Sequence, residues 1–561
     1  MVRSSTKSSH DDVRFSSPPL QVDGSDASSL HLCCGGAAVD ASLCVTTTGR
    51  PGLFCVGTSG TVRSFPLKHL LSVRGGDQGR LRLSAGKPRL VWDKSVSVGS
   101  GQDSKRNVLY MYFAVSKSAS AASVWRLRQL SLEFASNADL TKFLEALNTF
   151  LPTLPQRPKS LLVFLNPFGG KRRGPDIYQF EVAPLFKTVG IETTVVLTTA
   201  RQHAYKELLN RKSLQEFDGV VSVGGDGLFN ELLSALVVRR QLERSIRAGD
   251  RRVALSAVTL PIGLVPAGSS NSTVRTLQGV DDAFTAALRI VLGEKLRVDV
   301  CAIHRGEKGL LKLSAGIASC GFLGDVIKDS EEFRHLGPSR YVVSGLRTLV
   351  RHPACVGTVG FSLSDREYSA DGSSAALDLH CVDDCQVCNY KTKEPSEAAT
   401  ACGIRGGSRD ATATDGDYAH HWSGRFNHVI CCVLPCVSEL SPKGLSRWAS
   451  LDDGTMDLAC VSRAPRLHTF SLLRRLWMAG GRAFVNGADV KLFNVTRFCF
   501  VPSEQEDDQS PAADQGVYWN VDGELMRQPP EALHFRVHRA LAAVFGNDAA
   551  YREITVTTKR H

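Results

Sequence analysis

The stretch VSVGGDGLFNEL, from Val221 to Leu232, decides the fold class of this chain. It begins as a continuous apolar strand, turns through glycines on both sides of Asp226, and continues as a helix. A buried strand that passes into a helix in this way is typical of a parallel sheet covered by helices. Sheets of this kind bind ligands at the carboxyl ends of their strands. The sequence therefore predicts a ligand site at Asp226, although an isolated Gly-Asp-Gly also fits a simple exposed turn.

Two further apolar strands end in loops that suit a phosphate. LNPFGGKRRG spans 165–174, and its glycines at 169 and 170 let the backbone approach an anion next to the charge of Lys171. The loop lacks the Walker A spacing, and a glycine pair after a strand can also be only a tight turn. PIGLVPAGSSN spans 261–271 and offers hydroxyls and backbone amides. Three such loops in one sheet favour a nucleotide site over coincidence.

The pattern of strands and helices divides the chain into domains. Strands alternate with helices over 158–295, which predicts an α/β nucleotide-binding lobe. Short strands dominate 296–545, which predicts a second lobe built as an antiparallel β-sandwich, with a low-complexity insert at 366–417. Upstream, the strands and final amphipathic helix of 31–152 resemble a pleckstrin-homology domain, although an unrelated small β domain remains possible. Residues 1–30 are expected to form a disordered tail.

Composition limits the possible partners and the cellular location. The 561 residues carry a net charge of +11, which favours polyanions such as acidic membranes or phosphate ligands. No Lys/Arg run is long enough for a nucleic-acid tail, so no nucleic-acid partner is expected. No signal peptide is recognisable, and no apolar run reaches the about 18 residues of a spanning helix. We expect a cytoplasmic protein that meets membranes from the surface, with its 16 cysteines as reduced thiols.

The three loop motifs together lead to a known family. NPFGGK, GGDGLFNE and PAGSSN resemble the diacylglycerol-kinase-type catalytic domain of lipid kinases. WNVDGEL at 519–525 resembles the family's fourth signature and is expected to fold back onto the nucleotide cleft. Within the family the chain is most similar to the ceramide kinases, through the segments 321–350 and 441–461. The cysteines of CVDDCQVC in the insert have the same CxxxCxxC spacing as ceramide kinases.

The resemblance implies an enzyme that uses ATP and Mg²⁺ to phosphorylate the primary hydroxyl of ceramide, giving ceramide 1-phosphate. It implies Asp226 as the general base that accepts the proton of that hydroxyl. The residues implied at the ATP site are Asn166, Pro167, Phe168, Gly169, Gly170, Lys171, Thr198, Thr199, Ala200, Arg201, Gln202, Glu231, Ser269, Ser270, Asn271, Arg334, Arg340, Asp522, Gly523 and Glu524. The residues implied beside the lipid are Gly224, Gly225, Asp226, Gly227 and Asp325.

Alternatives remain for the substrate and the activity. Sphingosine kinases carry an acidic residue for the amine of their substrate, and Ile327 stands at that position here. This favours ceramide, although a sphingosine or diacylglycerol kinase is an alternative. Asn271 departs from the typical ceramide kinase and leaves its contact open. A non-catalytic membrane scaffold is disfavoured by the intact motifs at Asp226 and 522–524. A soluble NAD kinase, which shares the GGDG loop, is disfavoured by the N-terminal domain and the basic charge.

Two segments have more than one interpretation. Cys381, Cys385 and Cys388 form either a metal-binding thiol cluster or a group of reduced thiols. RLHTFSLLRRLWMAGGRAF at 466–484 is basic and amphipathic. It fits a calmodulin-binding or membrane-surface helix, and equally a helix that is packed in the second lobe.

Overall fold

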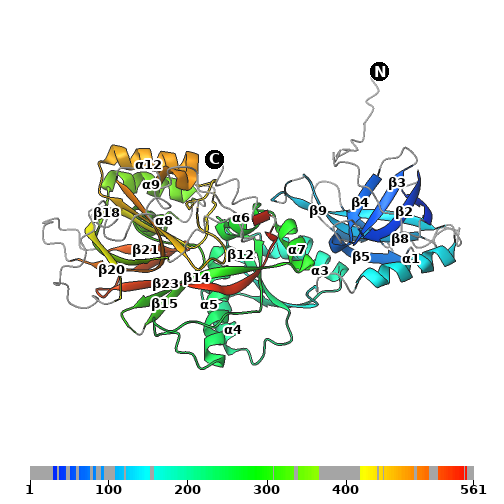
Figure 1. The fold of residues 1–561 in the computed structure, drawn as a ribbon, viewed down its shortest axis with the longest axis horizontal. Coiled ribbons are helices and arrows are strands. Elements are labelled where there is room, and N and C mark those ends of the chain that lie inside the picture. The colour runs from blue at the N-terminus through cyan, green and yellow to red at the C-terminus, as the bar shows by residue number, and fades with distance from the viewer. Residues whose placement is uncertain are drawn as a thin grey trace, which may run out of the picture. The chain divides into compact units, whose positions relative to one another are not determined.

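The computed structural model describes most of the chain (Figure 1). The described residues are 30–34, 37–45, 51–57, 62–75, 80–83, 90–93, 108–118, 120, 122–134, 136–151, 157–307, 309–333, 336, 339–364, 417–438, 441–446, 448–484, 489–503, 516–548 and 550–551. The chain divides into an N-terminal unit, up to residue 155 apart from 82–91, and a larger unit that holds the rest. The described residues leave out 1–29 of the expected tail at 1–30, most of the insert, Arg334 and the three insert cysteines.

The N-terminal unit is an antiparallel sheet of seven described strands with one helix. The strands are β1 (Leu30–Cys34), β2 (Ala37–Val45), β3 (Pro51–Gly57), β4 (Val62–Pro66), β5 (Leu70–Gly75), β8 (Val108–Ser116) and β9 (Trp125–Phe134), in the order β4-β3-β2-β1-β9-β8-β5. The remaining elements are η1 (Leu67–His69) and the pair β6 (Arg80–Leu83) and β7 (Leu90–Asp93). Helix α1 (Asn137–Phe150) begins at Ser136, whose hydroxyl accepts a hydrogen bond from the Asp139 amide.

The core of this unit follows the alternation in its sequence. Leu130, Leu132 and Phe134 of β9 are buried at every second position, and Phe143 and Leu147 of α1 pack against them. The strands and the closing helix thus agree with the expected order of elements. The assignment to the pleckstrin-homology fold stays a prediction.

The larger unit begins with a four-strand parallel sheet. Its strands are β10 (Ser160–Leu165), β11 (Glu192–Leu197), β12 (Gly219–Gly224) and β13 (Ile262–Pro266), in the order β11-β10-β12-β13. The central strands are continuously apolar because helices cover both faces. Helices α4 (His203–Asn210) and α5 (Asp226–Glu243) cover one face. Helix α7 (Ala283–Leu292) packs on the other, where Ile290 fills the space at Gly263 (Figure 1).

Four short helical elements complete this α/β part. The segment after β10 forms α2 (Gly174–Ile177), the π-helical turn η5 (Tyr178–Val182) and α3 (Ala183–Thr188), and α6 (Ser272–Gln278) follows β13. The predicted mixed α/β architecture is therefore confirmed for the larger unit. The parallel strands all deliver their carboxyl ends to one edge, where the glycine-rich loops begin.

The remaining strands continue the same sheet instead of forming a separate one. They are β14 (Lys295–Arg305), β15 (Leu310–Ser314), β16 (Ile317–Gly321), β17 (Cys355–Leu363), β18 (His420–Cys432), β19 (Met456–Ser462), β20 (Val490–Pro502), β21 (Tyr518–Val521), β22 (Glu524–Arg527) and β23 (Leu533–Phe545). Strand β23 pairs in parallel with β13 and antiparallel with β14 and β20. The last long strand thus joins the two lobes, which local sequence patterns did not reveal because this pairing spans most of the domain.

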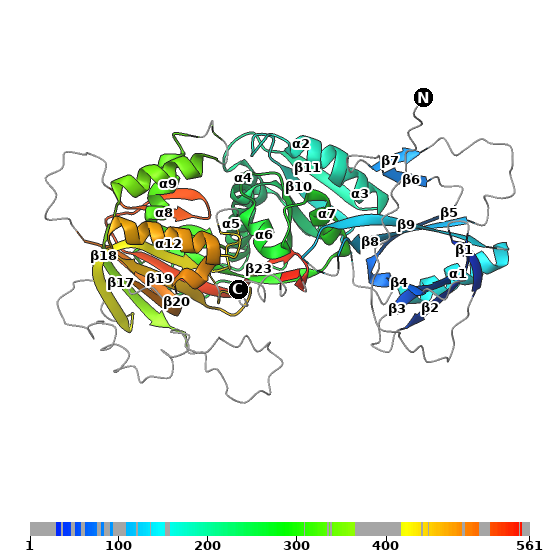
Figure 2. The same ribbon diagram turned by 90° about the horizontal axis from the view of Figure 1, so that it is seen from above.

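The β-rich lobe is closed by strand pairings and covered by helices. Strands β17 and β19 each pair with both β18 and β20, and aromatic side chains fill the space between them. Helices α8 (Phe322–Ser330), α9 (Arg340–Arg351) and α12 (Arg466–Ala479), with the 3-10 turn η7 (Gly480–Phe484), lie outside the strands (Figure 2). Within the described part of the chain, no helix combines the length and apolarity needed to cross a membrane.

Candidate active site

The loops after β10, β12 and β13 meet at one edge of the parallel sheet. A Cβ atom on Gly170 would lie 2.7 Å from the carbonyl oxygen of Ala267, and a Cβ on Gly268 would lie 2.4 Å from the Cα of Gly225. Real Cβ atoms do not approach other atoms this closely, so only glycine permits the contacts. The structure thus brings together the three loops that the sequence singled out, and leaves bare backbone where they meet.

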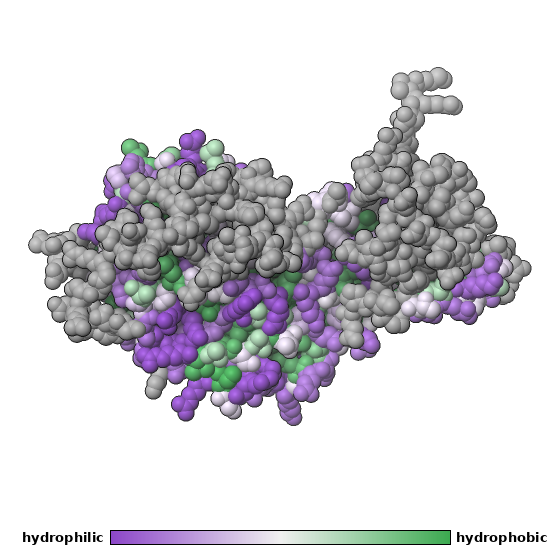
Figure 3. All heavy atoms as spheres, viewed as in Figure 1, coloured by the Kyte–Doolittle hydropathy of each residue, from purple (hydrophilic) through white to green (hydrophobic). Residues whose placement is uncertain are grey.

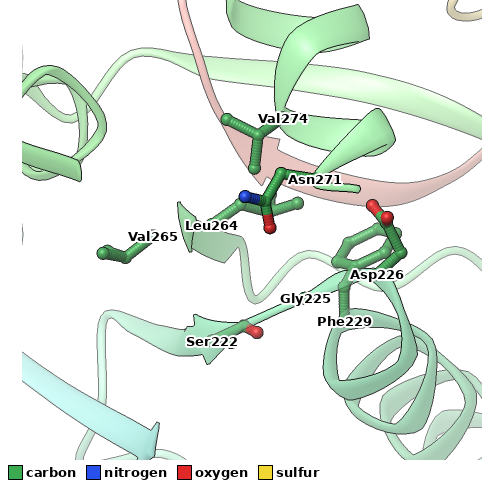
Figure 4. Close-up of a pocket in the computed structure, with 9 residues that line it drawn as sticks. Ser222, Gly225, Asp226, Phe229, Leu264, Val265, Asn271 and Val274 are labelled. Atoms are coloured by element: carbon green, nitrogen blue, oxygen red, sulfur yellow. The ribbon is translucent and has the colours of Figure 1, made fainter. Parts of the chain in front are cut away.

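Asp226 occupies the first turn of α5, directly beyond the end of β12. Its two carboxylate oxygens accept hydrogen bonds from the backbone amides of Ser272 and Thr273, at 3.1 and 2.9 Å. Figure 4 shows this carboxylate turned toward the start of α6, beside Asn271. Each oxygen keeps a further lone pair, so the group can still accept a proton or bind a cation. The two hydrogen bonds therefore fix the position of the Asp226 carboxylate and leave lone pairs free on both of its oxygens.

A small cavity lies directly beneath this carboxylate. It is lined by Ser222, Gly224, Gly225, Asp226, Phe229, Leu264, Val265, Asn271 and Val274 (Figure 4). Most of these groups come from the ends of β12 and β13 and from the first turns of α5 and α6. Three polar side chains, those of Ser222, Asp226 and Asn271, thus line the cavity together with apolar groups.

Asn271 shapes the loop after β13 instead of reaching outward. Its backbone φ is +52°, a left-handed conformation that asparagine tolerates better than most residues. The side-chain oxygen accepts from the Gly268 amide at 2.9 Å, and the side-chain nitrogen donates to Asp281 at 3.0 Å. These partners occupy the amide that sequence reasoning assigned to ATP. Its neighbours Ser269 and Ser270 are exposed and half-buried, so their hydroxyls remain accessible.

The loop after β10 is ordered by Asn166. Its side-chain oxygen accepts from the amides of Phe168 and Gly169, at 2.9 and 3.1 Å, which bends the chain at the strand end. Phe168 is 65% exposed, and Lys171 is exposed as well. The loop therefore presents an aromatic ring and a cation to a ligand at this edge.

The segment 198–202 is attached to the same edge by Glu231. The Glu231 carboxylate, on α5, accepts from the Gln202 amide at 2.8 Å, where α4 begins. Burial raises the pKa of Glu231, backbone hydrogen bonds oppose that shift, and the nearby charge of Glu524 raises it further. Thr198 is buried against Leu165, whereas Thr199, Ala200 and Arg201 are exposed.

The downstream signature at 522–524 does reach this edge, but its two acids play different parts. The Asp522 carboxylate accepts from the amides of Ala315, Gly316 and Ile317, at 3.2, 3.1 and 2.7 Å. Burial raises the pKa of Asp522 to about 6. Asp522 therefore holds the β15–β16 turn together. Glu524 is the acid that lies beside the glycine loop of Asp226.

Glu524 lies next to the GGDG loop and is paired with cations. One of its oxygens is 3.7 Å from where a Cβ on Gly227 would sit. Its carboxylate accepts from the ammonium group of Lys312 and lies 3.9 Å from the Arg201 guanidinium. Sequence reasoning missed Lys312, which stands in β15 outside any motif. Lys312 can pair with Glu524 because the folded chain places β15 beside the 522–524 hairpin.

Comparison with known proteins bears directly on this site. Residues 160–303 match the diacylglycerol kinase catalytic domain, and residues 375–558 match the ceramide kinase C-terminal domain. Ceramide kinase 1 of Caenorhabditis elegans is 36% identical, over 76% of this chain and 73% of that protein. The ceramide kinases of Homo sapiens and Mus musculus are 32% and 31% identical, over 80% and 75% of this chain and 84% and 80% of theirs.

This chain belongs to the ceramide kinase family. The predicted resemblance is confirmed, and with it the predicted class of enzyme, an ATP-dependent lipid kinase. Both matched regions lie in the larger unit, apart from the N-terminal sheet.

Two further residues expected at the site, Arg340 and Asp325, lie on helices of the β-rich lobe. Arg340 begins α9, where its guanidinium binds the hydroxyl of Tyr341 at 2.6 Å and lies 3.9 Å from Glu331. Asp325 lies on α8, which packs against β21 of the 522–524 hairpin. Burial raises the pKa of Asp325 to about 6, and Lys328 opposes the shift. Ile327, two residues on, is half-buried on the same helix.

The described cysteines do not form a metal site. Within the described ranges, no group of three His, Cys, Asp or Glu side chains is arranged to hold a metal ion. The described cysteines that carry side-chain detail are free thiols, and burial raises the pKa of Cys301 and of Cys460. Metal binding by the insert cysteines stays a prediction.

Proposed function

We propose that this chain transfers the γ-phosphoryl group of ATP to the primary hydroxyl of ceramide, giving ceramide 1-phosphate. The observation that carries the proposal is the fixed carboxylate of Asp226 at the meeting point of three glycine loops. The matches to ceramide kinases and to the ceramide kinase C-terminal domain support ceramide as the acceptor. Ile327 adds support, because an amide-bearing lipid needs no carboxylate to pair with an amine.

The triphosphate is placed by backbone and by cations. The glycines of 169–170 and 224–227 carry no side chains, so phosphate oxygens can approach the backbone at these loops. Lys171, Arg201 and Lys312 surround the same edge with positive charge. Phosphoryl transfer depends mostly on such alignment and charge neutralisation, since the protein contributes little covalent chemistry.

Asp226 acts as the general base in this scheme. The lipid hydroxyl donates a hydrogen bond to the carboxylate and loses its proton to it as the oxygen attacks the γ-phosphorus. The bond from phosphorus to the β,γ-bridging oxygen breaks, and ADP leaves with that electron pair. The amides of Ser272 and Thr273 keep the carboxylate oriented toward the hydroxyl throughout.

The acidic groups at the cleft suit Mg²⁺. A nucleotide-bound Mg²⁺ needs only one or two protein carboxylates, with phosphate and water as its other ligands. The charge of Glu524 raises the pKa of Glu231, so two acids repel each other here. Glu524 is the residue that would hold the ion. When bound, Mg²⁺ neutralises charge on the transferred phosphoryl group.

We further propose a peripheral protein that contacts anionic membranes from the cytoplasm. The net charge of +11 supports this, and so does a pleckstrin-homology-like N-terminal unit with its closing helix α1. Calmodulin binding at 466–484 has weaker support. Leu472 and Leu476 of α12 are buried in the lobe, so a protein that wraps this helix must first detach it.

Labelled ATP with separate micelles of ceramide, sphingosine and diacylglycerol tests the substrate. We expect transfer to ceramide, and preferential transfer to sphingosine would overturn the choice. Asp226→Asn should lower kcat at least about 100-fold while the chain stays folded. Asp452→Asn, at an exposed aspartate, is the matched control and should leave kcat unchanged. Turnover near wild type in Asp226→Asn would reject the general base.

A further inference from the structure

Helix α9 exposes its apolar side and buries its polar side. Val343, Leu346 and Val350 are 38%, 61% and 74% exposed, at a spacing that places them on one face. The opposite face holds Ser344 and Thr348, which are buried and have no hydrogen-bond partner among the described residues. Helices of water-soluble domains show the reverse arrangement. No described residue buries the apolar face of α9, so we expect that a binding partner covers it.

Helix α12 has apolar residues on both of its faces. Leu472 and Leu476 are buried against the lobe, as expected for a packed helix. Its outer face carries four large apolar side chains that are at least half exposed. They are Leu467 at 80%, Phe470 at 52%, Trp477 at 60% and Met478 at 53%. The buried inner face is sufficient to pack α12 onto the lobe. The exposed apolar side chains of the outer face therefore need a separate explanation.

The two helices are fastened together and present one surface. His352, at the end of α9, lies 3.0 Å from the hydroxyl of Thr469 on α12, and the Asn427 amide is 2.9 Å from both. Figures 1 and 2 both show α9 and α12 side by side on the outside of the β-rich lobe. Green and purple atoms mix over this region in Figure 3. We call the exposed residues of α9 and α12 the α9–α12 surface.

The charge on this surface is positive. Residues 466–479 include three arginines and no acidic residue. Arg474 is exposed within the apolar stripe of α12, between Phe470 and Trp477. Arg347 and Arg351 of α9 pair with Asp329, and Arg347 also pairs with Glu332, so their charge is largely balanced. The uncompensated charge therefore lies mainly on α12, next to an exposed tryptophan of the kind that is enriched at membrane interfaces.

We propose that the α9–α12 surface docks the kinase unit onto an anionic lipid bilayer. Apolar side chains flanked by arginine suit the boundary between acyl chains and acidic headgroups. The inference rests on the proposed function, since a lipid acceptor must be taken from a bilayer. The surface is well placed for this. Helix α9 packs on α8, and α8 packs on the hairpin that carries Glu524.

Vesicle sedimentation of the full chain tests the docking surface. The test variants are Leu346→Ser with Val350→Ser, Phe470→Ser with Trp477→Ser, and Arg474→Glu. Each apolar pair should weaken binding to phosphatidylcholine–phosphatidylserine vesicles about tenfold or more. Arg474→Glu should weaken it about tenfold on these vesicles but hardly at all on neutral phosphatidylcholine. All changed side chains are largely exposed, so folding should be retained.

Matched controls isolate the surface from general effects. Leu242→Ser removes an apolar side chain that is 64% exposed at the end of α5, and Lys187→Glu reverses an exposed charge on α3. Both should bind vesicles like the wild type. Asp226→Asn should also bind like the wild type while losing turnover, which separates docking from catalysis. Failure of wild-type turnover on ceramide with surface-dependent binding intact would reject only the proposed function.

Three results would overturn the docking proposal. The first is unchanged vesicle binding in all the surface variants, which would place membrane binding elsewhere on the chain. The second is surface-dependent capture by calcium-loaded calmodulin with unchanged vesicle binding. The third is a dimer of the wild type that the same substitutions dissociate, again with unchanged vesicle binding. A short-chain ceramide in solution gives a further check, since its turnover should be equal in wild type and surface variants.

Discussion

Gly268 lies so close to Gly225 that a Cβ atom on Gly268 would be 2.4 Å from the Cα of Gly225. This contact locks the loop after β13 against the loop that positions Asp226. The loop leads directly into α6, whose first residues, Ser272 and Thr273, supply both amides to the Asp226 carboxylate. The position of the base therefore depends on a backbone contact made by residues that carry no chemistry themselves.

Gly268→Ala should displace these loops. The added methyl has no room against backbone, so we expect a loss of about 1–3 kcal/mol in the free energy of unfolding. Because the amides that hold Asp226 would shift with the loop, kcat should fall about 100-fold. Urea unfolding and steady-state kinetics measure the two effects. Gly345→Ala is the control, since nothing lies within 4 Å of the added atom, and it should keep wild-type stability or exceed it. Equal behaviour of the two variants would reject the role of the contact.

Asp522 and Glu524 should respond differently to neutralisation. Asp522→Asn replaces one acceptor oxygen with an amino group in a site that offers three backbone amide donors. We expect a loss of about 1–3 kcal/mol in stability, because a buried donor is left unpaired. Glu524→Gln should keep the stability of the wild type and instead raise the Mg²⁺ concentration needed for half-maximal rate several-fold. Comparing urea midpoints and Mg²⁺ titrations of the two variants decides the assignment. A stability loss confined to Glu524→Gln would reverse it.

Glu231 should control ATP affinity through the 198–202 segment. Glu231→Ala removes the acceptor of the Gln202 amide at the start of α4, so we expect the KM for ATP to rise several-fold with a smaller change in kcat. Glu231→Gln keeps an acceptor oxygen and should restore most of the affinity. If glutamine restores the affinity for ATP, the hydrogen bond to Gln202 matters and the negative charge of Glu231 does not. If both variants bind ATP like the wild type, Glu231 has no part in the site.

The predicted parts of this fold are those coded by local sequence. The apolar runs of β10, β12 and β13 and the glycine loops after them predict a parallel sheet with a ligand site at the carboxyl ends of its strands. The downstream 522–524 segment was assigned to this edge by resemblance to known lipid kinases. The local sequence pattern around 519–525 does not predict this position, because it carries no information about a contact with the distant Gly227.

The features that sequence reasoning missed depend on long-range packing. The join of the two lobes by β23 requires pairing with strands over 200 residues away in sequence. Asn271 and Asp522 were expected at ATP because motifs report residue types, whereas their side-chain partners, Asp281 and the 315–317 turn, emerge only in the folded chain. The exposed face of α9 was missed for a similar reason. Its apolar spacing is that of any packed helix, and only burial shows which face points outward.

His428 offers a test of buried titration in the β-rich lobe. Both ring nitrogens are buried with no hydrogen-bond partner among the described residues, and the ring packs 5.4 Å from that of Phe322. Burial lowers the pKa of His428 to about 4, and the neighbouring His352 adds to the shift. An unfolded histidine titrates near 6.5, so below that pH the unfolded chain binds a proton that the folded chain refuses. This residue therefore makes stability fall as pH drops from about 6.5 to about 4.

His428→Leu should remove that loss. Leucine has a similar size and no polar atoms, so the variant should match or exceed the wild type at pH 7. From pH 7 to pH 5, the wild type should lose about 2 kcal/mol more stability than the variant, since about one and a half pH units separate pH 5 from the unfolded pKa. Urea unfolding at the two pH values measures the difference. The leucine variant keeps His534 and His538, whose pKa values burial also lowers, so some acid sensitivity should remain. An unchanged pH dependence would mean that His428 becomes protonated in the folded chain.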